Sequence, residues 1–306
     1  MNRTSRFIAL AGLLALAGPC LAGQTVDETR PAAADGRIEF KAVSGRFEVI
    51  GHDSDQWQLS GELGDDVAEL VIDGDRDHWT IEIRMKQGGF GWGMGKKASD
   101  LELRVPHGVE LSASTVSGDL MLRNLDGRSV DVRTVSGDLA LSAVRPANLD
   151  AKSVSGDLSA DTGGSEVNRL NSVSGDLKAS GLRGRIEMQS VSGDVTISGR
   201  MVSELAVESV SGEIEARIVP AERARVDLSS HSGDVELYLP ESIAVRVEAK
   251  TFSGNIASDF GGQVQSGRGP GESLSMNGPA AKVEIEAASF SGNVRIRHLD
   301  DEQAIQ

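Results

Sequence analysis

Short runs of alternating apolar and polar residues recur along most of the chain, on both sides of a four-residue motif. Five copies of this Ser-Gly motif read Val-Ser-Gly-Asp and begin at Val116, Val135, Val154, Val173 and Val191. Apolar residues alternate with polar ones after the motif, as in Leu120 and Leu122, and before it, as in Val130 and Val132. Alternation with a period of two is typical of half-buried β-strands. Each repeat therefore predicts two short strands joined at the Ser-Gly bend.

Further copies of the motif are altered at one or both ends. They begin at Val43, Val210, His231, Phe252 and Phe290 and end at Arg46, Glu213, Asp234, Asn255 and Asn293. From Ser117 onward successive copies are 18 to 21 residues apart, and the interval from Ser253 to Ser291 equals two periods. A fixed period of this size indicates a repeat architecture in which each unit stacks on the next. The doubled interval predicts one coil whose turn is replaced by a longer, glycine-rich loop.

The residue just before the motif carries a hydroxyl group in each regular copy. These residues are Thr115, Thr134, Ser153, Ser172, Ser190, Ser209, Ser230, Thr251 and Ser289. Stacking of parallel coils at about 4.8 Å would align them into a continuous ladder, whereas an antiparallel meander would give like residues no reason to align. The sequence therefore predicts an all-β protein, a parallel β-solenoid with coils of about 19–21 residues. The rule for parallel crossovers predicts that the coils are right-handed.

Residues 57–105 interrupt the period. Alternating segments at 57–59, 67–72, 79–83 and 101–105 are separated by Asp/Gly turns and read as antiparallel strands. A solenoid end leaves an unpaired strand edge and an open core, so a cap is expected there. We therefore predict a single solenoid domain over residues 37–298, with residues 50–105 as its N-terminal antiparallel cap. A polar tail, residues 299–306, is expected to cover the last coil.

The first 22 residues have the pattern of a secretory signal peptide. Arg3 and Arg6 give a basic start, residues 7–18 are apolar, and Cys20 and Ala22 are small residues at the cleavage-determining positions. We expect cleavage after Ala22 rather than lipid anchoring at Cys20, and hence export to the periplasm or cell surface. The apolar run is shorter than the roughly 20 residues of a membrane-spanning helix, so no transmembrane segment is expected in the mature chain. Residues 23–36 are almost devoid of apolar side chains and predict a flexible leader.

The charge of the chain argues against nucleic acid as a partner. The formal net charge is −15, and it becomes −17 when the two arginines of the signal peptide are removed. Such an acidic surface repels phosphate backbones. The same acidity helps to keep a β-rich protein in solution.

The acidic column that ends the motif has two interpretations. It contains Asp119, Asp138, Asp157, Asp176, Asp194 and Asp234, with Glu213 between the last two. Stacked aspartates bind calcium in some repeat proteins. We favour turn chemistry instead, because aspartate and asparagine side chains accept backbone hydrogen bonds at bends, and Asn255 and Asn293 fill the same column without a charge. No metal site is therefore predicted.

A glycine-rich stretch at residues 88–95 is the candidate contact loop. Phe90, Trp92 and Met94 alternate there with glycines, a pattern that disfavours regular structure. The three side chains either bind a partner or fold back onto the cap.

A β-helical carbohydrate-active enzyme is the catalytic alternative. Such a site needs converging carboxylates and, for sugars, aromatic platforms. The chain has five well-separated histidines and 4% aromatic residues, and no nucleophile with an adjacent base can be recognised. We predict no catalytic residue and no cofactor.

The Ser-Gly-Asp repeat resembles a bacterial family of exported β-strand-repeat proteins labelled as adhesins, related to the head GIN domain of autotransporter adhesins. Leu103-Arg-Val-Pro106 before the first regular copy, Leu239-Pro240 and the loop 267–271 also fit that family. The resemblance covers about residues 37–297. It implies the fold, and it implies no catalytic residue.

Together these features predict a non-catalytic, adhesin-like binding or scaffold protein of the cell envelope. Its expected partner is an envelope or surface protein, or a glycan. The alternative is an accessory protein of envelope-stress signalling that acts through protein contacts.

Overall fold

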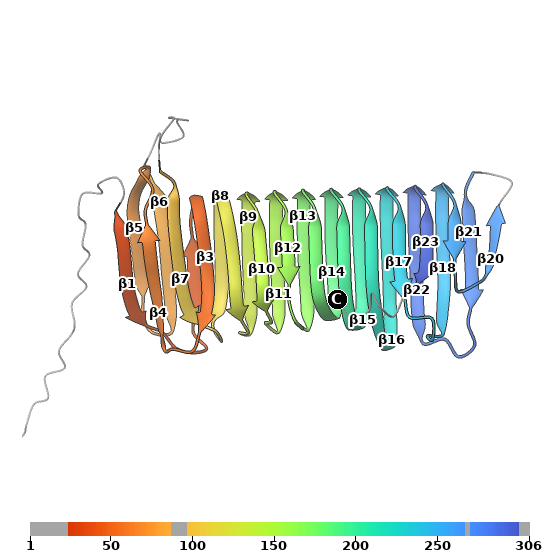
Figure 1. Cartoon of the computed structure of the whole chain (residues 1–306), viewed down its shortest axis with the longest axis horizontal. Coiled ribbons are helices and arrows are strands. Elements are labelled where there is room, and N and C mark those ends of the chain that lie inside the picture. Colours follow the sequence, from red (N-terminus) through yellow and green to blue (C-terminus); the bar gives the residue numbers. More distant parts are fainter. Residues whose placement is uncertain (1–23, 87–96, 267–269, 300–306) are drawn as a thin grey trace, which may run out of the picture.

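The computed structural model describes residues 24–86, 97–266 and 270–299. This part of the chain forms 23 strands and contains no helix. The strands stand side by side along one rod, in two layers that face each other across a thin core (Figure 1). The stretch before each Ser-Gly motif lies in the first layer, layer A, and the stretch after it lies in the second, layer B.

The fourteen strands of layer A follow one another in a spatial order that differs from the order in the chain. From the N-terminal end of the rod they are β5 (Val67–Gly74), β6 (His78–Met85), β2 (Arg37–Lys41), the first part of β8 (Glu110–Leu125), β9 (Ser129–Ser136), β11 (Asn148–Ser155), β13 (Val167–Ser174), the later parts of β14 (Leu177–Ser192), β15 (Val195–Ser211) and β16 (Ile214–Ser232), then β22 (Val283–Ser291), β18 (Val245–Ser253), β21 (Glu272–Asn277) and β20 (Gln263–Ser266).

Layer B is ordered in the same direction. Its strands are β1 (Thr25–Pro31), β4 (Gln56–Glu62), β7 (Ser99–Pro106), β3 (Ser44–His52), the second part of β8, β10 (Leu139–Val144), β12 (Leu158–Asp161), the first parts of β14, β15 and β16, then β17 (Val235–Leu239), β23 (Val294–His298) and β19 (Ile256–Ser258).

Parallel pairing in register confirms the predicted coil stack. Ser153 pairs with Ser172, which pairs in turn with Ser190, so equivalent residues of neighbouring coils lie side by side. The altered copy at Val43 belongs to the same stack, because Gly45 pairs with Gly118. The right-handed sense of the coils stays a prediction.

The core consists of apolar columns from the two layers. Every second residue beside the motif points inward, and Leu120, Leu139 and Leu158 are almost completely buried. Burial of one such side chain contributes roughly 1.5–3 kcal/mol, and stacking repeats that gain at every coil. At the N-terminal end the core widens to accommodate Trp57 and Trp79, whose ring centroids are 5.5 Å apart.

The corner of each coil needs glycine. Gly156 has φ +120°, and a Cβ atom there would lie 2.4 Å from the carbonyl oxygen of Gly137 in the preceding coil. The glycines of the neighbouring motifs are in the same situation. The Ser-Gly motif therefore repeats because the coils approach each other too closely for a side chain at this position.

The N-terminal section caps the rod. The sequence predicts a purely antiparallel cap, and the structure instead shows a mixed one. β6 and β7 pair parallel with the first coil, β2 and β3, and so extend the stack. Only the outer strands β5 and β4 reverse direction. The inner strands run parallel because they continue the hydrogen-bond ladder of the coil that they cover.

The predicted flexible leader is wrong for half of its length. Residues 25–31 form β1, which pairs antiparallel with β4. An edge strand needs few apolar residues, because its backbone supplies the pairing, and here Val26 and Ala32 are the buried anchors. The low apolar content of this segment concealed the strand.

The C-terminal end also departs from the prediction. The coil of β22 and β23 inserts between the coil of β16 and β17 and the coil of β18 and β19. The doubled interval in the sequence is not a coil with a long turn, because β20 and β21 form an antiparallel hairpin on the outer edge of β18. The last coil in the chain is therefore covered by another coil. Of the predicted tail, residues 299–306, Leu299 is buried and residues 300–306 lie outside the described residues.

Candidate functional site

An exposed apolar ridge runs along layer A. It consists of the first residue of each motif, and the exposed fractions of the regular members are Val116 44%, Val135 48%, Val154 46%, Val173 46%, Val191 48%, Val210 50%, Phe290 50% and Phe252 48%. Val43 and His231 occupy the same column. The hydroxyl residue before each motif points inward, so the next residue must point outward. Stacking in register then gathers these isolated apolar side chains into one line.

The ridge is aromatic at its C-terminal end. The rings of His231 and Phe290 are stacked with centroids 5.0 Å apart, and those of Phe290 and Phe252 with centroids 4.8 Å apart. Both pairs are almost parallel, because neighbouring coils repeat at the same spacing. The rings cover each other's faces, which leaves mainly their edges for an incoming ligand. Sugars bind to open aromatic faces, so this stack is a poor glycan platform.

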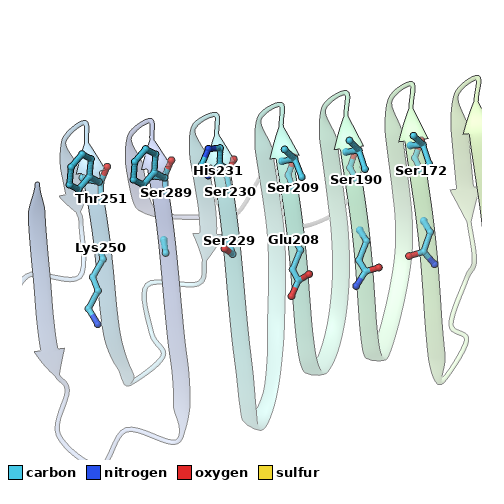
Figure 2. A pocket seen from close by; sticks show the side chains of 18 of the residues that line it. Ser172, Ser190, Glu208, Ser209, Ser229, Ser230, His231, Lys250, Thr251 and Ser289 are labelled. Atoms are coloured by element: carbon cyan, nitrogen blue, oxygen red, sulfur yellow. The ribbon is translucent and has the colours of Figure 1, made fainter.

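A groove of about 1120 Å³ lies beside the ridge and ends at the C-terminal hairpin. Its other side is the column two residues before the motif, where Lys152, Asn171, Gln189, Glu208, Ser229, Ala288 and Lys250 follow one another. Figure 2 shows Glu208, Ser229 and Lys250 on one line, with His231 on the line nearer to the Ser-Gly bends. Pro270 and Gly271 form the wall at the closed end. The groove is open along its length, so it suits an elongated partner.

The charges that line the groove are only partly neutralised. Lys152 forms an ion pair with Asp150, with 3.0 Å between Nζ and Oδ1. Within the described part of the chain, Glu208 and Lys250 form no ion pair. Both side chains are therefore available to a partner.

The predicted hydroxyl column stacks in register and is buried, and four of its hydroxyls, those of Ser153, Ser172, Thr251 and Ser289, donate to backbone carbonyls. Ser153 donates to Gly156 of its own motif, with 3.2 Å between the oxygens, and Ser289 donates to Gly233 of the adjacent coil at 2.9 Å. These four hydroxyls brace the corners, whereas those of Thr115, Thr134, Ser190, Ser209 and Ser230 are buried without a hydrogen-bond partner in the described part of the chain. Because the column points inward, it is not a binding surface.

The acidic column lies on the corners and forms a ladder between coils. Oδ1 of Asp119, Asp138, Asp157 and Asp176 accepts the backbone N–H of Asp138, Asp157, Asp176 and Asp194, respectively, at 2.9–3.1 Å. Asp194 accepts from Glu213, and Asp234 accepts from Asn293. Each carboxylate has one oxygen committed to the next coil. Among the residues that the structure describes, no three His, Cys, Asp or Glu side chains converge in a way that could hold a metal ion.

Crowding of carboxylates changes the pKa of Glu213. Burial raises this pKa, and the negative charges of Glu236, Asp194 and Asp234 raise it further. Burial also acts to raise the pKa of Asp234 itself, but hydrogen bonds from Asn293 and the charge of Arg295 outweigh it and lower that pKa. Arg295 bridges Asp234 and Glu236, at 2.9 and 2.5 Å from their oxygens.

The most acid-base-like arrangement in the described part of the chain is at His107. Its Nδ1 lies 2.6 Å from Asp126 and its Nε2 lies 3.3 Å from Asp53. Both ring nitrogens face carboxylates, which leaves neither to activate a nucleophile. This arrangement gives no support for catalysis.

The predicted contact residues Phe90, Trp92 and Met94 lie outside the described residues, and their role stays a prediction. The apolar ridge was not predicted. The sequence did contain a signal for it. A residue that follows an inward-pointing hydroxyl must face solvent, and nearly every copy of the motif carries Val or Phe at that exposed position. In the described part, no helix has the length and apolar character needed to cross a membrane.

Comparison with known proteins finds one matching family model and several similar solved structures. The family model described as "Toastrack DUF4097" matches residues 38–297. Among solved structures, the chain is similar to a "putative adhesin" of Bacteroides fragilis at 13% identity and a TM-score of 0.45, covering 90% of this chain and 97% of that one. It is also similar to a "putative cell adhesion protein" of Clostridium sporogenes at 11% identity and a TM-score of 0.29, covering 90% and 100%.

A third similar structure is a "putative lipid binding protein" of Parabacteroides distasonis, at 14% identity and a TM-score of 0.32, covering 92% of this chain and 99% of that one. No curated protein matches this chain. Similarities of this degree do not identify a ligand or an activity.

Proposed function

This chain belongs to the Toastrack DUF4097 family, and from that premise we propose that it is a non-catalytic, adhesin-like binding or scaffold protein of the cell envelope that contacts its partner through the apolar ridge. The proposal takes the coils to be right-handed and residues 1–22 to be a signal peptide that is cleaved after Ala22. Export to the periplasm or cell surface follows from that segment.

The continuity of the ridge supports this proposal more than any other observation. Eight valine and phenylalanine side chains, each 44–50% exposed, stand in one line and form an apolar strip, and the largest apolar patches on monomeric proteins are often functional. Isolated exposed valines need no explanation, but a line repeated in coil after coil does. Such strips are typical of protein contacts.

The rigidity of the ridge suits a scaffold. The residues before and after each central ridge residue pair with the coils on both sides, so the spacing of the ridge cannot adapt to a small ligand. A rigid, elongated surface favours an elongated or flat partner. This favours a protein over a single sugar, and the covered ring faces of Phe252 and Phe290 argue in the same direction.

Two alternatives remain as proposals. In the first, the protein is an accessory of envelope-stress signalling and makes its protein contacts through Phe90, Trp92 and Met94. In the second, it is a β-helical carbohydrate-active enzyme. A glycan-degradation assay that shows turnover, lost on substitution of exterior carboxylates, would favour the enzyme.

The proposed contact can be tested with charged substitutions on opposite layers. Val173→Asp/Val191→Asp places two charges in the ridge, and Ser159→Asp/Ser180→Asp places two on exposed positions of layer B. In gently solubilised envelope extracts, the native chain and the layer B variant are expected in a larger assembly, with the ridge variant released from it. Thermal midpoints of both variants control for folding. Retention of a folded ridge variant in the assembly would overturn the proposal.

A further inference from the structure

The partner of the apolar ridge can be deduced from the spacing, symmetry and charge of layer A. We propose that it is a second copy of this chain, packed layer A against layer A with the two rods antiparallel. The inference rests on the proposed function, because it names the occupant of the same ridge.

The pitch of the ridge selects another solenoid. Ridge residues recur once per coil, at about 4.8 Å, whereas same-side residues of an extended peptide recur at about 6.6–6.8 Å. The side chains of an extended peptide therefore cannot stay aligned with the ridge residues over more than a few coils. A second rod carries the same pitch and stays in step over the whole length.

The centre of the face is defined by its strand order. Layer A has fourteen strands, and its midpoint falls between β13 and β14. A two-fold axis through this midpoint, perpendicular to the rod and along the strands, gives full overlap of the two faces. It sets β13 of one copy against β14 of the other, and it creates the self-complementary interface of a closed dimer.

In this register the ridge is complementary in size. Val173 of one copy faces Val191 of the other, and Val116 faces Phe290. Phe252 at one end of the ridge faces Val43 at the opposite end. A large residue thus meets a small one wherever an aromatic ring occurs, which keeps the separation of the layers uniform. Parallel rods would set phenylalanine against phenylalanine and valine against valine, and the two faces would splay at one end.

The polar column beside the ridge is complementary in the same register at the centre of the face, whereas at each end Lys41 of one copy faces Lys250 of the other and the like charges oppose association. Lys152 of one copy faces Glu208 of the other, and Asn171 faces Gln189. Glu208 forms no ion pair within the described part of its own chain, so Lys152 of the second copy would be its first. The two charged pairs and two amide pairs follow from the register alone, as do the two like-charge pairs of Lys41 with Lys250.

The net charge of the chain opposes association. Two chains of charge −15 repel each other, and Asp176 of one copy approaches Asp194 of the other at the rim of the interface. The driving force is therefore apolar burial. The ridge residues of both copies are buried together with their polar flank, and a specific dimer needs about 1,000 Å² or more in total. Salt screens the repulsion and is expected to strengthen the dimer.

Sedimentation of the full chain tests the occupant. The native chain is expected to be a dimer at micromolar concentration, more so in 0.5 M than in 0.05 M NaCl, and Val173→Asp is expected to be monomeric while the layer B control Ser159→Asp stays dimeric. Lys152→Glu and Glu208→Lys should each weaken the dimer several-fold, and both changes in one chain should restore it. A native chain that stays monomeric at all salt concentrations overturns the proposal.

Cross-linking tests the orientation. Val135→Cys and His231→Cys, each in a Cys20→Ser background, are treated with a bis-maleimide that spans about 10 Å. In antiparallel rods residue 135 of one copy faces residue 231 of the other, while identical residues are five coils, or about 24 Å, apart. Cross-links are therefore expected only when the two variants are mixed. Cross-linking of either variant alone would show parallel rods and overturn the register.

The proposed function and this inference fail in different ways. One outcome is that the purified chain is monomeric but the variant Val173→Asp/Val191→Asp is released from the envelope assembly. The ridge then binds a different protein, and only the proposal that its partner is a second copy fails. If the folded ridge variant stays in the assembly, the ridge is not the contact and both proposals fail.

Discussion

At the scale of single residues, the glycine of the motif determines how closely the coils can stack. A Cβ atom in its place would point at the carbonyl of the glycine in the preceding coil, and its φ is positive in most copies. Two separate penalties thus apply to any side chain at this position: a steric clash between coils and left-handed backbone strain.

Comparison of two glycines separates these penalties. Gly175→Ala meets both, because its Cβ would lie 2.4 Å from the oxygen of Gly156 at φ +114°, whereas Gly261 has φ +92° and nothing within 4 Å. We expect Gly175→Ala to lower the free energy of unfolding by about 2–4 kcal/mol and Gly261→Ala by about 1 kcal/mol. Urea titration checks both values. Equal losses would show that strain alone makes glycine necessary.

The aspartate ladder predicts that the acceptor matters and the charge does not. Oδ1 of Asp157 accepts the N–H of Asp176 at 2.9 Å, and an asparagine can accept the same bond. Asp157→Asn is expected to leave stability unchanged or slightly higher, because it removes one of a line of like charges. Asp157→Ala should cost about 1 kcal/mol. Calcium and chelator should leave the melting midpoint of the native chain unmoved. If calcium raised the melting midpoint of the native chain and this increase were absent in Asp157→Asn, the result would contradict the ladder and favour a cation site.

Glu213 makes stability depend on pH in a defined direction. Its pKa is raised in the folded state, chiefly by burial and then by its acidic neighbours. The folded state therefore holds the proton more tightly than the unfolded state. The resulting stabilisation is complete below the unfolded pKa of about 4.3 and is lost as pH rises through the folded pKa. Glu213→Gln should raise the melting midpoint at pH 7 and give little gain near pH 4. A gain of the same size at both pH values would contradict this origin.

At the scale of elements, both ends of the rod are closed in the same way. The chain extends past a coil, forms antiparallel strands outside it and then returns to the inner side. β4–β7 do this before β8, and β20–β21 do it before β22. The side chain of Glu272 also accepts the N–H of Ile256 at 2.8 Å and so blocks part of the open edge of β19. Covered edges prevent end-to-end association of solenoids.

Removal of the C-terminal hairpin is expected to expose β18. A variant in which residues 263–277 are replaced by a short Gly-Ser linker leaves the outer edge of Val245–Ser253 unpaired. Light scattering should show concentration-dependent assembly of this variant into particles longer than a dimer, with Val264→Ser as a control that keeps the hairpin. A deletion variant that scatters like the native chain would mean that β18 is protected by other means.

The repeat predicted most of the fold because nearly every coil needs a glycine at its corner, where a side chain would clash with the neighbouring coil. The stack, the inward hydroxyls and the corner aspartates follow from the period of two and from stacking in register. The ends could not be predicted in the same way. β1 has few apolar residues, and the insertion of β22 between β16 and β18 leaves no mark in the local pattern, because each coil has the same surfaces for a neighbour on either side.

The apolar ridge could have been predicted from the sequence, but the position of its residues in the turn motif made them look like core residues. Val at the head of a recurring turn motif looks like part of the core until the buried hydroxyl before it is placed. Phe252 and Phe290, far apart in the chain, become a stacked pair only through the rearranged order of the last coils. Tertiary order, which the sequence pattern does not contain, creates the aromatic end of the ridge.

At the scale of the whole molecule, the described residues form a rod whose exposed large apolar side chains lie along one line, apart from Met201 and Val264. The rod keeps that line straight and evenly spaced. The central claim is therefore that contacts in the cell are made along this line and not on the opposite layer.

Site-specific photo-cross-linking in the cells that make the protein tests this claim most directly. A benzophenone side chain is introduced singly at Val154, Val173 and Val191 on the ridge and at Ser159, Lys178 and Thr196 on layer B. The account predicts adducts at all three ridge positions and none at the layer B positions, with peptides of a second copy of the chain among the ridge adducts. Adducts confined to layer B, or equal on both layers, would contradict it.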